Sequence, residues 1–264
     1  LESSWSKKYG TRVNLSEQKL YYHGKRDEGG LRDGLFTTAT LAYVSGHGFT
    51  VPWEFDWRYN PATWREPVPV HGPYAYKHSC DGYDETCSDT AHQGVFACRR
   101  GAGPLLCGWR TPEDTGGVRV KSAGTELWDL TDRDASIRHI KSALLANREI
   151  VLSVMVTEAL AAALEGDGYV RYEGEPQSNL GGHAMHIVGY VDNDTLALVT
   201  PDAPPGDFGK PGTKGMGGYL IARNSWGPCF GDGGYLYLPY RWLKPDHFVS
   251  SAVMLDTDDL EPTE

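Results

Sequence analysis

The feature that most constrains this chain is a strongly apolar, glycine-framed stretch at residues 181–240. It reads GGHAMHIVGY, then a loop rich in Pro and Gly, then GGYLIARNSWGPCFGDGGYLYLPY. Each apolar run is typical of a β-strand and places one polar group, His183 or Asn224, at its edge. A strand end restrains an imidazole, and an amide on a second strand fixes which ring nitrogen carries the proton. The pattern indicates either an oriented general base or, on spacing alone, a buried histidine and a turn asparagine of an ordinary β-rich core.

The residue sequences of the two motifs favour the oriented general base. HAMHIVGY at residues 183–190, followed by RNSWG at residues 223–227, resembles the papain-like cysteine peptidases. In that family the His is the catalytic base, the Asn orients it, and the Trp shields their hydrogen bond from water. The resemblance implies these roles for His183, Asn224 and Trp226. It further implies a supporting role for Ser225 and a place in the substrate cleft for Gly182.

The resemblance also implies a fold and a division of the chain. The expected class is α+β: a papain-like two-lobe fold in which a mainly helical lobe packs on an antiparallel, β-barrel-like lobe, with the cleft between them. Residues 1–117 are expected to be the remainder of the helical lobe, with an irregular, Cys-containing insertion at residues 62–117. Residues 118–264 are expected to form the β-rich lobe, which carries His183 and Asn224 and ends in an acidic tail.

Local patterns after residue 118 agree with this order. An aspartate at position 132 or 134 is a suitable N-cap for a helix whose last turn is closed by Arg148. The β-branched run at residues 150–156 predicts a buried strand. A short alanine-rich helix and an alternating strand at residues 169–172 are expected next. The apolar face of the first helix is formed by Ile137, Ile140 and Leu144.

The nucleophile that the family requires is missing from its place. In papain-like enzymes the Cys lies at the N-terminal end of a central helix, where the helix dipole and the imidazolium keep the thiol ionised. Residues 3–9 have helical character, and LES followed by LSEQ resembles the tail of that helix and the short helix after it. The first cysteine is Cys80, and the Gln of the oxyanion hole is also absent.

Two functions therefore stay open. The chain is part of a cysteine peptidase whose Cys lies on a missing segment or on a separate small N-terminal chain. Alternatively, it is a catalytically inactive papain-like module that holds peptides or a partner protein. The family mechanism requires no metal and no organic cofactor.

A glycine pair, Gly29 and Gly30, precedes a predicted helix at residues 31–44. The resemblance implies that this pair lines the substrate cleft and pairs its backbone with an extended peptide. On the residues alone, a plain helix-capping turn is an equal alternative. Glu54 and the segment 57–61 resemble the Glu and the Trp-Pro-Tyr type segment of the family.

Four of the five cysteines lie in the insertion at residues 62–117. Their spacing does not match the close pairs of a zinc ribbon. We expect two disulfides that staple an irregular segment, with free thiols and a metal site as the alternatives. No helix signal surrounds these cysteines, so none is expected to be the nucleophile. They are Cys80, Cys87, Cys98 and Cys107.

Several neighbours of the motifs are further candidates for site residues. His186 lies three residues after His183 and so on the opposite strand face, which favours a packed or surface histidine over a second base. Asn224 is preferred as the orienting group because it alone lies in the matching motif. Cys229, the odd cysteine, is expected to be free or paired with the missing segment. The carboxylates that could orient His183 in place of Asn224 are Asp192, Asp194 and Asp202.

Charge and hydropathy exclude some classes of partner. The formal net charge is −10, which argues against nucleic acid or an anionic membrane as a main partner. No run of about 18 apolar residues is present, so no membrane-spanning helix is predicted. The expected partner is a peptide or protein substrate. The compartment is not readable, and only the expected disulfides favour secretion or another oxidising compartment.

Overall fold

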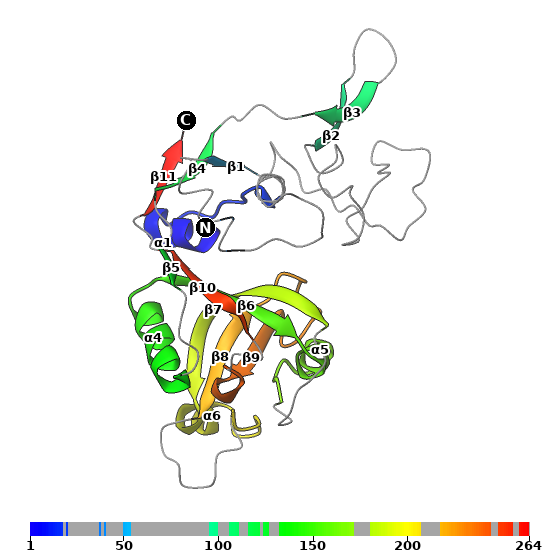
Figure 1. Ribbon diagram of the computed structural model, residues 1–264. Helices are drawn as coiled ribbons and strands as arrows, with labels where there is room; N and C mark the ends of the chain where they lie inside the picture. Colours follow the sequence, from blue (N-terminus) through cyan, green and yellow to red (C-terminus); the bar gives the residue numbers. More distant parts are fainter. Residues whose placement is uncertain are drawn as a thin grey trace. The chain divides into compact units, whose positions relative to one another are not determined.

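The computed structural model describes fourteen parts of the chain, which fall into two compact units (Figure 1). One unit is formed by Leu1–Ala123 together with Asp258–Glu264, and the other by Gly124–Thr257. For residues 95–99, 106–110, 124–126 and most of 248–255, the backbone alone is described. The described residues are 1–17, 20, 37, 40, 50–53, 95–99, 106–110, 116–121, 124–126, 132–171, 180–206, 217–243, 248–255 and 259–263.

The first unit contains a short helix and a three-stranded antiparallel sheet. Helix α1 (Glu2–Tyr9) confirms the helical character predicted for residues 3–9, and it ends at Gly10, whose φ of 69° is the left-handed cap that glycine adopts at low cost. The Lys8 ammonium and the Tyr9 hydroxyl both donate to the Leu260 carbonyl, which ties the helix to the last strand. The strands are arranged in the order β1 (Thr50–Pro52), β4 (Gly117–Val120) and β11 (Leu260–Thr263).

A separate two-stranded hairpin lies in the predicted irregular insertion. Strands β2 (Val95–Arg99) and β3 (Leu106–Arg110) pair antiparallel, with Cys98 directly opposite Cys107. The sequence did not predict these strands, because two five-residue runs among Gly and Pro carry little periodic signal.

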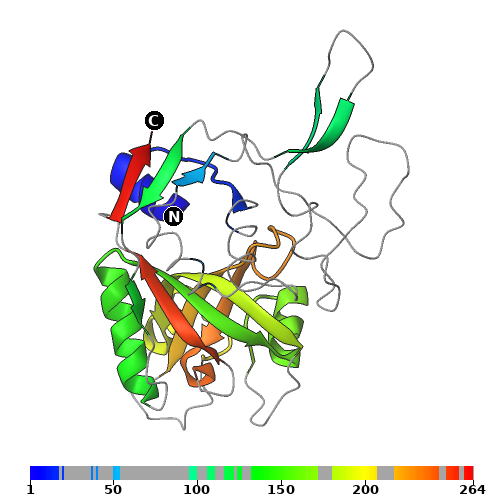
Figure 2. The ribbon, with the colours of Figure 1, turned by 45° about the horizontal axis from the view of Figure 1, so that its top comes forward.

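The second unit is built on an antiparallel sheet of six strands, which run through the centre of the unit in Figure 2. Within the described residues β5 and β9 are the outermost strands, so the expected barrel-like lobe is an antiparallel sheet that does not close into a barrel. The order is β5 (Gly124–Glu126), β10 (Phe248–Leu255), β6 (Glu149–Val156), β7 (Gly181–Asp192), β8 (Gly218–Arg223) and β9 (Tyr235–Pro239).

Helices α4 (Arg133–Leu145) and α5 (Glu158–Glu165) each begin after a residue whose side chain caps the helix N-terminus. The Asp132 carboxylate accepts from the Ala135 N–H at 2.9 Å, and the Thr157 hydroxyl accepts from the Leu160 N–H at 3.3 Å. Asp132, and not Asp134, is therefore the cap. Arg148 lies beyond the end of α4, so its expected place in the last helical turn is wrong.

Two other local expectations are corrected. The predicted loop after His183's strand contains helix α6 (Asn193–Val199), and a 3-10 turn, η2 (Tyr240–Trp242), follows β9. Tyr169 makes an isolated parallel bridge to Tyr237 in place of the predicted strand start, and its ring stacks on that of Tyr237 at 4.3 Å. Within the described part of the chain, no helix is long and apolar enough to span a membrane.

One apolar core holds the second unit together. Alternate residues of β6, β7, β8 and β9 point to the same face, where α4 and α5 add their buried sides. Because these apolar side chains are all buried on one face, the register of each strand is fixed. A slip by one residue would turn the row of apolar side chains to the opposite face of the sheet. Its largest fully buried members include Ile140, Ile150, Leu152, Leu160, Met185, Ile187, Leu220, Leu236, Tyr240 and Trp242.

Candidate active site

His183 lies near the start of β7, paired with Val154 of β6. Alternation along the strand puts it on the same face as Met185 and Ile187, both of which are buried in the core. The backbone of His183 is therefore held by a strand whose later residues are anchored. Its own side chain is half-buried, at the margin of that core.

Asn224 follows directly after β8 and is carried back to His183 by the register of the two strands. β7 and β8 are antiparallel, and His186 is opposite Arg223, so the residues after Arg223 run back along β7 toward His183. The Asn224 N–H donates to the Gly234 carbonyl at 2.9 Å, which closes the turn between β8 and β9. The Asn224 side chain is only 8% exposed, and its Oδ1 lies 2.8 Å from the Nε2 of His183.

The hydrogen-bond network assigns the imidazole tautomer. The backbone N–H of Ser225 also donates to the Asn224 side chain, at 2.8 Å, so the atom that it meets must be the amide oxygen. An oxygen has no proton to give, and the Nε2 of His183 is therefore the donor. In the neutral ring this leaves Nδ1 as the basic nitrogen.

Trp226 lies beside this pair. Its ring centroid is 5.0 Å from that of His183, and the two planes are tilted by 43°. Phe230 meets the same indole edge-on at 5.6 Å. The indole is still 46% exposed, so it covers one side of the imidazole without closing the site to solvent.

The turn that presents Asn224 and Trp226 depends on a glycine. Gly231 has a φ of 59°, and a Cβ built there would lie 2.4 Å from the Tyr235 carbonyl oxygen. Its N–H donates to the Leu164 carbonyl at 2.7 Å, which joins the turn to the end of α5. The turn is thereby tied to the core that also holds β7.

The remaining predicted site residues are distributed as follows. Ser225 contributes its backbone N–H, a contact that the sequence did not reveal. Gly182 is exposed at the start of β7, and a Cβ there would meet nothing within 4 Å in the described part of the chain. Cys229 carries an exposed free thiol. Of the helix predicted at residues 31–44, Thr37 and Thr40 are described, and both are helical. The other predictions lie outside the described residues: Gly29, Gly30, Glu54, the segment 57–61, Cys80 and Cys87.

His186 and Asp192 have partners of their own, apart from His183. The Nε2 of His186 lies 2.5 Å from a carboxylate oxygen of Glu149, a residue that is 6% exposed. Asp192 accepts from the Lys141 ammonium and, at 3.0 Å, from the Tyr240 hydroxyl. The sequence did not reveal Glu149, because nothing local marks a contact between residues 37 positions apart.

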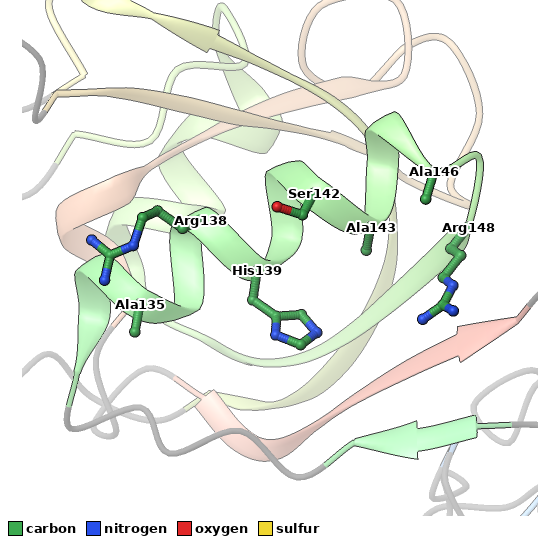
Figure 3. A pocket seen from close by; sticks show the side chains of 7 residues that line it. All are labelled: Ala135, Arg138, His139, Ser142, Ala143, Ala146 and Arg148. Carbon is green, nitrogen blue, oxygen red and sulfur yellow. The ribbon is translucent and has the colours of Figure 1, made fainter.

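A hollow on the second unit lies apart from the predicted site residues. Figure 3 shows that its side chains come from one face of α4 and from Arg148 after it. None of the predicted site residues lines it. In the part of the chain that the structure describes, no group of three His, Cys, Asp or Glu side chains is placed to hold a metal ion. The hollow is lined by Ala135, Arg138, His139, Ser142, Ala143, Ala146 and Arg148.

Comparison with known proteins establishes the family. The model of the papain family of cysteine proteases matches residues 106–243, slightly more than half of the chain, and this match includes His183, Asn224 and Trp226. The chain belongs to the papain family. An uncharacterized peptidase C1-like protein of Acanthamoeba polyphaga mimivirus is 28% identical over 132 residues. That match covers 50% of this chain and 35% of the viral protein, so the chain spans about a third of that relative.

Solved structures show the same fold. Xylellain, a cysteine protease from Xylella fastidiosa, matches with a TM-score of 0.55 and 19% identity, over 93% of this chain and 71% of its own. A procathepsin B from Trypanosoma congolense matches with a TM-score of 0.50 and 15% identity, over 99% of this chain and 65% of its own. At these identities the likeness concerns the fold, which is α+β and papain-like.

Proposed function

We propose that this chain supplies the base and its orienting amide to a cysteine peptidase that hydrolyses peptide bonds. The observation that carries the proposal is the contact of 2.8 Å between the Nε2 of His183 and the Oδ1 of Asn224. That contact leaves Nδ1 of the imidazole as the atom that takes a proton from the nucleophile. The nucleophilic Cys belongs to a segment or a small chain outside the present sequence.

The mechanism assigns each group one task. The thiolate, paired with protonated His183, attacks the substrate carbonyl carbon, and backbone N–H groups stabilise the oxyanion. His183 then gives its proton to the leaving amine. Water clears the acyl-enzyme, with His183 taking a proton from the water and returning it to the departing thiol. No metal or organic cofactor is required by these steps.

Asn224 and Trp226 act through His183. The amide oxygen keeps Nε2 protonated and so keeps Nδ1 directed at the nucleophile. An indole on one side of the imidazole limits the access of water to the hydrogen bond, and such a bond is stronger where the local dielectric is lower. Asn224 and Trp226 are therefore positioning residues, and His183 is the catalytic residue of this chain.

Peptides and proteins are the proposed substrates. Xylellain is named as a cysteine protease, and the surface beside Gly182, which is open within the described residues, fits the approach of an extended chain. Gly29, Gly30 and Gly182 are proposed to line the cleft, where backbone pairing gives affinity with little sequence selectivity.

A second candidate function rests on the absence of a nucleophile in the sequence before Cys80. Under it, the chain is an inactive papain-like module that uses the same surface to hold a peptide or a partner protein. The His183–Asn224 contact favours the enzyme, because a module that only binds gains nothing from an oriented base.

Labelling with a thiol-directed epoxide separates the two. The complete native protein, with every segment and chain that accompanies these residues, is treated with the epoxide and mapped by mass spectrometry. The peptidase gives one adduct on a cysteine outside the present sequence, formed much more slowly in His183→Ala. An adduct confined to Cys229, or no adduct on freshly purified complete protein, overturns the proposal.

A further inference from the structure

The register of the β2–β3 hairpin places two cysteines directly opposite one another. Val95 pairs with Arg110 and Phe96 with Trp109, and the same uninterrupted register pairs Cys98 with Cys107. Residues that are directly opposite in an antiparallel pair lie on the same face of the sheet. The spacing of the four cysteines in the sequence allows three pairings, and it does not choose among them.

Backbone geometry at this position matches what a cystine needs. Opposite residues of an antiparallel pair have Cα atoms about 4.5 or about 5.5 Å apart, depending on whether they exchange hydrogen bonds. Disulfides join residues whose Cα atoms are about 4.4 to 6.8 Å apart. The Cα–Cα distances of both kinds of pair fall within that interval, so a disulfide can form without displacement of either strand.

A cross-link would also stabilise the hairpin. Within the described residues, β2 and β3 pair only with each other and belong to neither larger sheet. An isolated two-stranded hairpin is marginally stable in water. A covalent bond between opposite positions removes most of the conformations in which the two strands are separated.

We propose that Cys98 and Cys107 form a disulfide that closes the β2–β3 hairpin. This inference does not depend on the proposed peptidase function. It goes beyond the expectation of disulfides in the insertion by naming the pair, and it leaves Cys80 and Cys87 to each other. Cys229, whose thiol is exposed and free, stays outside both pairs.

The bond forms by thiol–disulfide exchange with a donor disulfide, either a small-molecule disulfide or that of an oxidoreductase. The thiolate of one cysteine attacks a donor sulfur, which forms a mixed disulfide and releases one donor thiol. The second cysteine then attacks the protein sulfur of the mixed disulfide and releases the other donor thiol. Two protein thiols are oxidised, one donor disulfide is reduced to two thiols, and the two protons end on those thiols.

Peptide mapping without reduction tests the pairing. The full chain is equilibrated in a glutathione redox buffer, blocked with N-ethylmaleimide under denaturing conditions, and cut with trypsin and an endoproteinase that cleaves before aspartate. These cuts put Cys80, Cys87, Cys98 and Cys107 on four separate peptides, because aspartates stand at 81, 84 and 89 and arginines at 99, 100 and 110. We expect residues 89–99 linked to residues 101–110, with the link lost on reduction.

Serine variants provide the controls. In Cys98→Ser we expect Cys107 to change from unlabelled to fully labelled by maleimide, with Cys80 and Cys87 unchanged. Cys229→Ser removes one labelled thiol and leaves the 98–107 link intact. The proposal is overturned if residues 89–99 are linked to the peptide of Cys80 or Cys87, or if maleimide labels both Cys98 and Cys107 in the wild type. It is also overturned if Cys80 or Cys87 becomes newly labelled in Cys98→Ser, or if the 98–107 link is lost in Cys229→Ser.

Discussion

The imidazole of His183 and the amide of Asn224 meet through a single oxygen that has two donors. The Nε2 of His183 and the backbone N–H of Ser225 both lie 2.8 Å from the Asn224 Oδ1. Because the second donor is a backbone group, the amide cannot rotate to present its NH₂ without losing that bond and meeting another donor. The orientation of the imidazole is thus determined by the backbone of the turn after β8.

The first prediction concerns this pair in the complete enzyme. His183→Ala should remove turnover, since general acid–base catalysis alone contributes about 10²- to 10⁴-fold. Asn224→Ala should lower kcat/KM by a smaller factor, because the imidazole remains and only its orientation and tautomer are released. The measurement is hydrolysis of a fluorogenic peptide. Ser225→Ala is the matched control and should be near wild type, since the contact to Asn224 comes from the backbone N–H. Equal residual activity in His183→Ala and Asn224→Ala would contradict these roles.

The second prediction concerns the indole beside the imidazole. If Trp226 acts by covering the His183–Asn224 hydrogen bond, then Trp226→Ala should reduce kcat/KM clearly in the wild-type background and only slightly in Asn224→Ala. Phe230→Ala, which removes a ring that contacts Trp226, should have the weaker effect. A double-mutant cycle on kcat/KM measures the coupling. Additive losses would mean that the indole contributes by another route, such as substrate contact.

The third prediction concerns Glu149 and His186. His186→Ala removes a hydrogen bond between an imidazole that is 25% exposed and the carboxylate of Glu149, a residue that is 6% exposed. Loss of a hydrogen bond to a charged group costs about 1.5 to 3 kcal/mol of unfolding free energy. Urea unfolding gives the value.

The exposed pair of Asp167 and Arg171 in the same unit is the control for this measurement. The hydrogen bond from Arg171 lowers the pKa of Asp167, yet both side chains are about half exposed. Arg171→Ala should therefore cost at most about 0.5 kcal/mol. A loss in His186→Ala as small as that in Arg171→Ala would show that the Glu149–His186 pair contributes little to folding. In the complete enzyme, folded His186→Ala should keep its activity, because His186 is not a second base.

The fourth prediction concerns stability in alkali. Burial, and then the hydrogen bond that its hydroxyl donates to Asp232 at 2.7 Å, raise the pKa of Tyr237 well above the ordinary value for tyrosine. The unfolded chain therefore loses this proton at lower pH than the folded chain does. The contribution of Tyr237 to stability is fully present below about pH 10 and is lost as the pH rises above that value.

Tyr237→Phe is the matched variant, because it cannot ionise. The unfolding free energy of the wild type should fall more steeply than that of Tyr237→Phe between about pH 9 and about pH 11. Chemical denaturation at each pH provides both slopes. Parallel slopes would show that Tyr237 ionises equally easily in the two states.

Much of the second unit was predictable from local signals. An aspartate cap at position 132 or 134, the apolar face of α4 and the β-branched run of β6 each depend on neighbours within a few residues. The structure confirms these elements and places the cap at Asp132. Two short motifs predicted the papain-like fold, because their residue sequences and their order along the chain are specific. The roles given to Gly29 and Gly30 stay predictions.

Errors arose where a pattern was short or where distant parts decide the outcome. Helix α6 spans seven residues and the hairpin strands five each, too few for a period to stand out. The isolated bridge from Tyr169 to Tyr237 of β9, where a strand was predicted, follows from which segments pair, and composition does not report pairing.

By itself, the sequence determined the family, the class of fold and the residues that a papain-like site would use: His183, Asn224 and Trp226. Only the tertiary structure decided how these residues meet, through the β7–β8 register that carries Asn224 back to His183 and the Ser225 N–H that orients its amide. The same holds for Glu149 beside His186 and for Cys98 opposite Cys107. The physical reason is that capping and periodicity act over a few residues, whereas strand register depends on burying a whole apolar face at once.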